Sequence, residues 1–348
     1  MNYFFPSPIP SLLIKQSILP ELKYTVNSGT NALRVLLRSF EFPKDTKIAI
    51  PSYVCSAVKH AVTKENLVPV SLDLKNGHTF WTHYDLEKIK TENSKAIVLV
   101  HLYGFIHPDS EEIIKFCKAN DIKLIHDAAQ SFGVDENCLE GDGIIYSFGP
   151  GKSTTAAGGA IIKRYNANLR SINLKTPSFF SFQNIRSKLF LKSRIVGYTL
   201  NKVESFLNSV IHKLPHNEDL IFTMDQFQLE MASYVVSNFE TIKSQRKNRY
   251  TILLDKIKAN SFIEILPSDN LNGLYFKMIL FIKEDVNKFK MFLSDNHVPY
   301  FCLADCIEKN AALVNFTETA ERIVELSCEA SIPEDEIVRV AEIVSRYK

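Results

Sequence analysis

The chain has 348 residues, with 41 Lys and Arg against 39 Asp and Glu, which gives a formal net charge of +2. Its hydrophobic share of 45% and charged share of 23% are typical of globular proteins and exclude a disordered, collagen-like or coiled-coil chain. The nearly balanced charge argues against a protein built to coat nucleic acid, so no nucleic-acid partner is expected. The length fits two domains, or one large α/β domain with an appendage.

The N-terminal segment lacks a basic region, and prolines interrupt its apolar residues, so a signal peptide is not expected. No segment approaches the roughly 18 apolar residues of a membrane-spanning helix. The six cysteines are scattered, and the close pair Cys302 and Cys306 has no second Cys or His pair nearby, so no metal site is predicted. These features indicate a cytoplasmic enzyme without an integral membrane span.

Short apolar runs alternate with helical patterns between about residue 27 and residue 165. Most of these runs are continuously apolar, which is typical of strands buried on both faces. The predicted strands cover residues 47–50, 68–72, 96–100, 122–125 and 143–148, and one of the predicted helices covers 111–120. The alternation predicts βαβ units and a mainly parallel sheet, whose ligands gather at the carboxyl ends of the strands.

Residues 166–220 differ, because a breaker-rich aromatic stretch precedes an amphipathic pattern from Ile185 to Ile211. We favour helix packing over membrane docking for this pattern, since alternating basic and apolar residues are common in surface helices. The later predicted elements are a helical run over 223–256, a strand over 274–282 and a terminal helix over 333–347. We therefore expect a large domain over 1–220 and a smaller C-terminal domain over 221–348 that includes a connecting helix.

Two of the segments contain candidate ligand-binding residues. The first is the glycine turn Asn27–Leu33, which leads into an amphipathic helix whose free N–H groups can bind an anion. An ordinary helix N-cap by Ser28 or Thr30 has the same sequence pattern. The second is Asp127, which follows a buried strand and precedes small alanines that let a flat ligand approach, although a carboxylate that caps the next helix also fits.

A third segment contains Lys152. The residues Gly151, Lys152 and Ser153 match the end of a Walker loop, but Tyr146 stands where that loop needs a glycine. Lys152 lies just past a buried strand, among glycines and hydroxyl residues. Such a position suits a lysine that forms a Schiff base, because its amine must be partly desolvated and close to a flat cofactor.

Together these segments resemble the fold type I pyridoxal-phosphate enzymes, and most closely the DegT–StrS sugar aminotransferase family. The similar motifs are Ser28–Leu33, Ile50–Cys55, Val100–Gly104, His126–Gln130, and Ser147–Phe148 with Lys152. They follow the order of the family, and the resemblance covers nearly the whole chain. It implies an α/β fold with a three-layer, mainly parallel sheet, a smaller C-terminal α+β domain, and a homodimer with active sites at its interface.

The resemblance also implies pyridoxal 5′-phosphate as the cofactor. Lys152 is then expected to carry the cofactor and to move a proton between the substrate carbon and the cofactor carbon. Asp127 is expected to keep the ring nitrogen protonated, and Gln130 to bond the phenolic oxygen. The other expected cofactor contacts are Gly29, Thr30 and Ser147 at the phosphate, Asn31 in the same turn, and Cys55 at the ring. His101 and Tyr103 match the signature without an assigned contact.

Some positions depart from the family pattern. The segment Ile221–Met224 occupies the place of the family's Asn-aromatic-Arg-Met motif, in which the Asn of a neighbouring subunit reaches the phosphate. Ile221 and Thr223 replace the Asn and the Arg, and Cys55 replaces the aromatic residue that stacks on the ring. A His-Gly stretch that contacts the nucleotide-sugar in the family is missing. These departures weaken the prediction of the substrate more than that of the cofactor.

The resemblance predicts an aminotransferase that moves an amino group from an amino acid, such as glutamate, to a nucleotide-linked keto sugar in surface-glycan or related biosynthesis. Lys152 argues against the dehydrating relatives, in which a histidine replaces the lysine. Two alternatives stay open. The enzyme could aminate a non-sugar ketone with the same cofactor, or the chain could be a non-catalytic member that acts as a binding partner.

Overall fold

The computed structural model describes residues 24–74, 84–149, 151–154, 156, 158–163, 174–175, 220–267, 273–307 and 319–348. The amphipathic pattern from Ile185 to Ile211 lies outside these residues.

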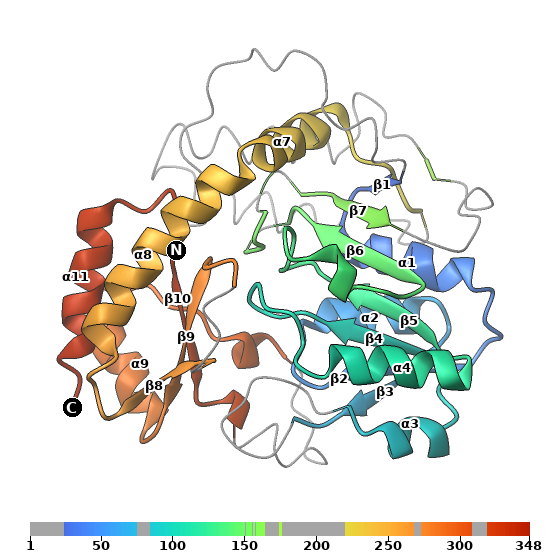
Figure 1. Cartoon of the computed structure of the whole chain (residues 1–348), viewed down its shortest axis with the longest axis horizontal. Coiled ribbons are helices and arrows are strands. Elements are labelled where there is room, and N and C mark those ends of the chain that lie inside the picture. The colour runs from blue at the N-terminus through green and yellow to red at the C-terminus, as the bar shows by residue number, and fades with distance from the viewer. Residues whose placement is uncertain are drawn as a thin grey trace, which may run out of the picture.

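A seven-stranded sheet forms the larger part of the described chain (Figure 1). In chain order its strands are β1 (Thr25–Val26), β2 (Lys47–Pro51), β3 (Val68–Leu72), β4 (Ala96–Val100), β5 (Lys123–Asp127), β6 (Gly143–Ser147) and β7 (Ala160–Lys163). Their spatial order is β1-β7-β6-β5-β4-β2-β3, and the pairs from β6 through β3 are parallel, whereas β7 and β1 are antiparallel. The mainly parallel sheet is thus confirmed, and the parallel strands end at one common edge.

Helices cover both faces of this sheet. They are α1 (Gly29–Ser39), α2 (Ser56–Lys64), α3 (Leu86–Thr91) and α4 (Ser110–Asn120), with the short 3₁₀ helix η1 (Glu136–Cys138) before β6. Side chains alternate along each strand, so Val98 of β4 packs with the α1 and α2 side, while Ile97 and Leu99 pack with α3 and α4. Two helical layers with the sheet between them confirm the predicted three-layer fold.

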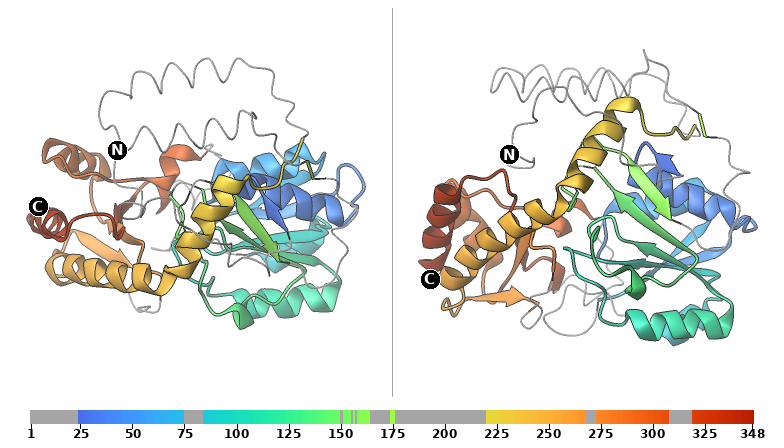
Figure 2. Two further views of the ribbon diagram at one scale, coloured as in Figure 1. Left: turned by 90° about the horizontal axis from the view of Figure 1, so that it is seen from above. Right: turned by 45° about the horizontal axis from the view of Figure 1, so that its top comes forward.

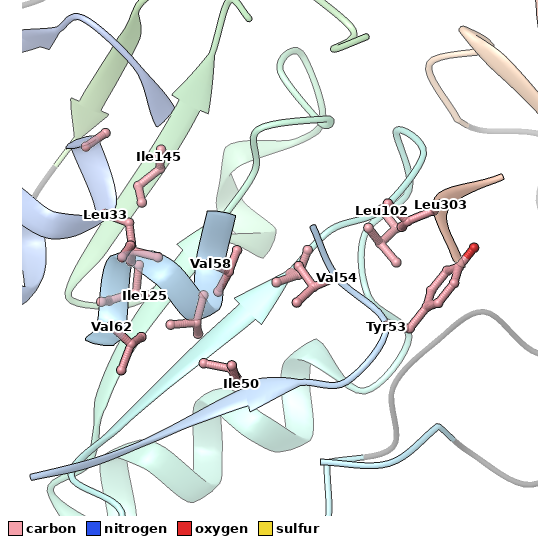
Figure 3. Close-up of a cluster of buried hydrophobic side chains, with 14 of the residues drawn as sticks. Leu33, Ile50, Tyr53, Val54, Val58, Val62, Leu102, Ile125, Ile145 and Leu303 are labelled. Atoms are coloured by element: carbon pink, nitrogen blue, oxygen red, sulfur yellow. The ribbon is translucent and has the colours of Figure 1, made fainter. Parts of the chain in front are cut away.

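The core between α1, α2 and the sheet is built from aliphatic side chains. Figure 3 shows Leu33 of α1 and Val62 of α2 close to Ile125 and Ile145 of the central strands. Each fully buried aliphatic side chain contributes about 1.5–3 kcal/mol. This packing places the start of α1 beside the end of β6.

Two helices connect the large sheet with the C-terminal part of the chain. They are α7 (Gln226–Ser237) and α8 (Phe239–Ile257), which break at Asn238, whereas the sequence pattern predicted one run over 223–256. Asp225 forms a capping box with Gln228, which explains why α7 begins at residue 226. Met231 of α7 belongs to a core cluster with β6 side chains, while α8 continues to the C-terminal part (Figure 2). The division of the chain at residue 220 stays a prediction.

The C-terminal part contains a three-stranded antiparallel sheet in the order β10-β9-β8. Its elements are β8 (Ile263–Leu266), β9 (Lys277–Ile282), α9 (Val286–Asp295), η3 (Leu303–Cys306), β10 (Ile323–Ser327) and α11 (Glu334–Ser345). The predicted strand over 274–282 thus begins at Lys277. Helices α8 and α11 lie side by side against this sheet (Figures 1 and 2). Within the described ranges, no helix has the length and apolar character needed to cross a membrane.

Candidate active site

Lys152 lies in the loop that joins the antiparallel strands β6 and β7. The N–H of Phe148 donates to the Gly159 carbonyl at 2.9 Å, so the two sides of the loop stay paired beyond the strands. The hydroxyl of Thr154 donates to the carbonyl of Ser147 at 2.9 Å. These bonds fold the loop back on the end of β6, and Lys152 therefore lies at the carboxyl edge of the sheet.

Asp127 is the last residue of β5 and lies at the same edge. Its carboxylate accepts the N–H of Ala129 at 3.0 Å, and the residues after it form a turn and not a helix, so the helix-cap interpretation is wrong. Burial raises the pKa of the Asp127 carboxyl above its ordinary value, and the Lys152 ammonium opposes part of this effect. A protonated ring nitrogen placed beside this half-buried carboxylate would offset its desolvation, so Asp127 fits the role that the resemblance implies.

Gln130 follows in the turn after Asp127. Its Oε1 accepts the backbone N–H of Tyr103 at 2.8 Å. Because a backbone N–H can only donate, the oxygen of the amide faces Tyr103 and the NH₂ group is the end that can donate to a ligand. This orientation fits a donor to the phenolic oxygen of the predicted cofactor.

Tyr103 has a left-handed backbone with φ +57°, which is uncommon for a bulky residue. Its buried hydroxyl donates to the Glu325 carboxylate of β10 at 2.8 Å and accepts from Tyr53 at 2.8 Å. Glu325 also forms an ion pair with Lys277 and accepts the N–H of Leu303 at 3.2 Å. The Tyr103 residue of the signature thus connects Gln130 to the C-terminal sheet, a role that the sequence did not reveal.

The start of α1 and the end of β6 form a set of donors. Ser28 is the N-cap of α1, since its hydroxyl accepts the backbone N–H of Asn31 at 3.2 Å. Gly29 and Thr30 lie before Asn31 in the first turn, where backbone N–H groups have no acceptor within the helix. A Cβ at Gly29 would lie 3.1 Å from the Ser147 hydroxyl, so glycine permits this close approach. No acidic residue occurs in the first turn of α1. These donors and the helix dipole suit a phosphate.

Asn31 and Cys55 were also predicted to contact the cofactor. The Asn31 side chain donates to Asn27 at 2.9 Å and accepts from Arg34 at 3.1 Å, so both ends of its amide bond protein groups. Cys55 is half-buried and precedes α2. For both residues, contact with the cofactor stays a prediction.

Ile221 lies in the core of the large sheet, where it is 3% exposed. Its carbonyl accepts the N–H of Lys175 at 3.0 Å, and the Thr223 N–H donates to the Lys175 carbonyl at 2.9 Å. The N–H of Asn27 donates to the Phe222 carbonyl at 2.9 Å. The side chain that replaces the family's Asn therefore packs inside its own subunit.

A chain of neutral histidines includes His126, the residue before Asp127. The backbone N–H of His107 donates to Nδ1 of His101 at 3.1 Å, so the His101 ring carries its proton on Nε2. This Nε2 donates to Nδ1 of His126 at 2.9 Å. Nε2 of His126 then donates to the Glu140 carbonyl at 3.0 Å. Burial lowers the pKa of His126 to about 4 and that of His101 well below its ordinary value. Both rings are therefore uncharged at neutral pH.

Arg246 of α8 is a further residue that the sequence did not assign to the site. Its guanidinium donates to the carbonyl of Ser153, the residue after Lys152, at 2.7 Å. Arg246 lies within the predicted helical run, but its partner becomes visible only in the fold.

Comparisons with known proteins agree with this geometry. The model of the DegT/DnrJ/EryC1/StrS aminotransferase family matches residues 21–345. The chain is 31% identical over 150 residues to UDP-N-acetyl-3-dehydro-alpha-D-glucosamine 3-aminotransferase of Acidithiobacillus ferrooxidans, which covers 41% of this chain and 40% of that protein. The chain thus spans about two fifths of the length of such curated relatives.

Solved structures show the same fold. The structure of DesV from S. venezuelae has a TM-score of 0.69 at 16% identity and covers 92% of this chain and 83% of that one. NtdA from Bacillus subtilis with bound cofactor PMP has a TM-score of 0.66 at 18% identity and covers 92% and 73%. With the family match over most of its length, the chain belongs to the DegT/DnrJ/EryC1/StrS aminotransferase family of pyridoxal-phosphate-dependent enzymes.

Proposed function

We propose that the protein transfers an amino group from an amino acid, with glutamate as the expected donor, to a nucleotide-linked keto sugar. It would bind pyridoxal 5′-phosphate and work as a homodimer in the cytoplasm, in surface-glycan or related biosynthesis. The observation that carries this proposal is the common edge of the sheet, where the half-buried Asp127 ends β5 and Lys152 follows β6 in a loop tied back to Ser147.

When bound, the cofactor supplies an aldehyde that bonds amines and a protonated ring that withdraws electrons. The Lys152 amine would bond the aldehyde and later move a proton at the substrate carbon. Asp127 would hold the proton on the ring nitrogen, and the Gln130 NH₂ group would donate to the phenolic oxygen. The N–H groups at the start of α1 and the Ser147 hydroxyl would bind the phosphate.

The names of the relatives support a keto sugar as the acceptor. The A. ferrooxidans protein is named for a nucleotide-linked dehydro sugar. Ile221, Thr223 and Cys55 favour a second candidate, the amination of a ketone that is not a nucleotide-sugar, since all three depart from the family pattern.

Cofactor binding is tested first. Purified protein with added pyridoxal 5′-phosphate should gain a visible absorbance band, and borohydride should attach the cofactor to Lys152 in a peptide map. A colourless protein that takes up no cofactor would overturn both aminotransferase candidates and leave the non-catalytic alternative.

The acceptor is tested second, on protein that has been loaded with cofactor and an amino-acid donor. Amino transfer to nucleotide-linked keto sugars, compared with simple 2-oxo acids, distinguishes the two candidates. Cofactor binding without transfer to either class would favour a binding protein.

A further inference from the structure

A buried ion pair connects the C-terminal sheet to the Lys152 loop. Arg246 of α8 is 2% exposed, and Glu329, which follows β10, is 4% exposed. Nη2 of Arg246 donates to Oε1 of Glu329 at 3.0 Å and to Oε2 at 2.8 Å, while Nη1 donates to the Ser153 carbonyl at 2.7 Å. One guanidinium therefore joins a carboxylate of the C-terminal part to the backbone beside Lys152.

The pair of Arg246 and Glu329 fixes the position of the Ser153 backbone more than it stabilises the fold. Two buried charges lose their hydration, and an apolar pair of similar volume is often at least as stable. The Nε of Arg246 is buried and has no hydrogen-bond partner in the described part of the chain, so the guanidinium is not fully satisfied. The planar guanidinium of Arg246 instead fixes the angle between the Glu329 carboxylate and the Ser153 carbonyl.

The described bonds hold the loop residues 151–154, which include Lys152, from two sides. Thr154 bonds the end of β6 on one side, and Arg246 approaches from α8 on the other. Without Arg246, the bond to the Ser153 carbonyl, which comes from outside the β6–β7 loop, would be lost. The backbone beside Lys152 would then be held less firmly relative to Asp127.

We propose that Arg246 and Glu329 are positioning residues that hold Lys152 in place for the cofactor aldehyde. The C-terminal part of the chain would thereby set the position of the lysine without touching it. The expected effect on cofactor binding rests on the proposed function. The anchoring of the backbone beside Lys152 can be measured without any cofactor.

Arg249, one turn further along α8, offers a matched control. Its Nε donates to the Ile332 carbonyl at 2.9 Å and its Nη2 to the Ala330 carbonyl at 2.9 Å. It thus links the same helix to the same loop after β10, but none of its described bonds reaches the Lys152 segment. Arg249→Met removes comparable links and leaves the proposed anchor in place.

The experiment compares Arg246→Met with Arg249→Met. In cofactor-free protein, Arg246→Met should speed amide hydrogen exchange in peptides that contain Lys152 by about tenfold, and Arg249→Met by less than about twofold. With pyridoxal 5′-phosphate added, Arg246→Met should weaken binding about tenfold and slow borohydride attachment at Lys152, because small displacements of a reacting group are costly. Equal effects of both variants would overturn the proposal.

A double variant distinguishes position from stability, and also serves if Arg246→Met alone does not fold. Arg246→Met with Glu329→Leu removes both charges, so the thermal midpoint should return toward that of the unaltered protein. The exchange and binding defects should remain, because the bond to Ser153 is still missing. Full recovery of slow exchange and of cofactor affinity in the double variant would refute a positioning role.

The proposed function and this inference fail separately. If the unaltered protein binds no cofactor, the proposed function is wrong, while hydrogen exchange still decides whether Arg246 anchors the segment. If the unaltered protein binds the cofactor and both single variants exchange alike, only the inference is wrong.

Discussion

At the carboxyl edge of the large sheet, the residues after β5 and β6 follow the family pattern more closely than the residues after β2. After β5 and β6, the residues Asp127, Gln130, Ser147 and Lys152 are all present, and hydrogen bonds or charges orient each of the first three. After β2, the half-buried Cys55 occupies the position of an aromatic residue.

This difference separates two parts of the chemistry. Under the proposed function, the side that is complete would hold the ring and phosphate of the cofactor, whose atoms must be held whatever the acceptor is. On the side that departs, Cys55 offers only a small thiol where the family has an aromatic residue that stacks on the ring. We therefore expect substitutions on the first side to have large effects and those on the second to have small ones.

Lys152→Ala should have the largest effect. Amino transfer should fall by at least about 10³-fold, since one amine both bonds the cofactor and moves the proton. Single-turnover rates measure the loss, and an unchanged circular dichroism spectrum is the control for folding. Normal turnover in this variant would refute the assignment of Lys152.

Asp127→Asn should have the second-largest effect on amino transfer. The neutral amide no longer favours a protonated ring, so proton removal from the donor amino acid should slow by about 10²-fold or more while the cofactor stays bound. The rate of the first half-reaction is the measurement. Full activity would mean that another group holds the ring nitrogen.

The buried histidine chain that includes His126 predicts a dependence of stability on pH. His126 has a folded pKa of about 4, below the ordinary 6.5, so the unfolded chain takes up its proton first as the pH falls. The free energy of unfolding should therefore decrease between about pH 6.5 and pH 4, by about 3 kcal/mol from His126 alone.

Urea unfolding at several pH values measures this dependence. The raised pKa of Asp127 acts in the opposite direction, so the informative quantity is the difference between the unaltered protein and His126→Gln. If the variant lost stability on acidification as steeply as the unaltered protein, His126 would not be the group responsible.

Ser147→Ala should have a moderate effect. Loss of one hydroxyl donor to the phosphate should weaken pyridoxal 5′-phosphate binding by about tenfold, since one hydrogen bond contributes about 1–1.5 kcal/mol. Titration of the visible absorbance gives the affinity. An unchanged affinity would place the phosphate away from the end of β6.

Cys55→Ala should have the smallest effect. The thiol presents little surface to a ring, so cofactor affinity and transfer rate should change by less than about twofold. The same titration and a steady-state assay measure both. A large loss would show that the β2 side also serves the ring, and the comparison of the two sides would fail.

The sequence predicted most of the large sheet because its strands are continuous apolar runs. It also predicted Lys152 and Asp127, since each follows such a run and lies in a recognisable motif. The break at Asn238 was not predictable, because both flanking segments have a helical pattern and tertiary packing places the turn.

The residues that support the site could not be predicted from a local sequence pattern, for a different reason. Tyr103 and Glu325 are 222 residues apart, and Arg246 and Glu329 are 83 apart. The first pair is brought together by the contact between the two sheets, and the second by the packing of α8 on the C-terminal sheet. A single sequence contains no periodicity that connects such positions.

Glu325 and Glu329 lie four residues apart, yet they reach different segments of the large sheet. The first bonds Tyr103 directly, and the second reaches Ser153 through Arg246. The two parts of the chain are therefore not interchangeable modules. A chimera that receives the C-terminal part of a relative would need a carboxylate at both places, or its lysine and glutamine would lose their supports together.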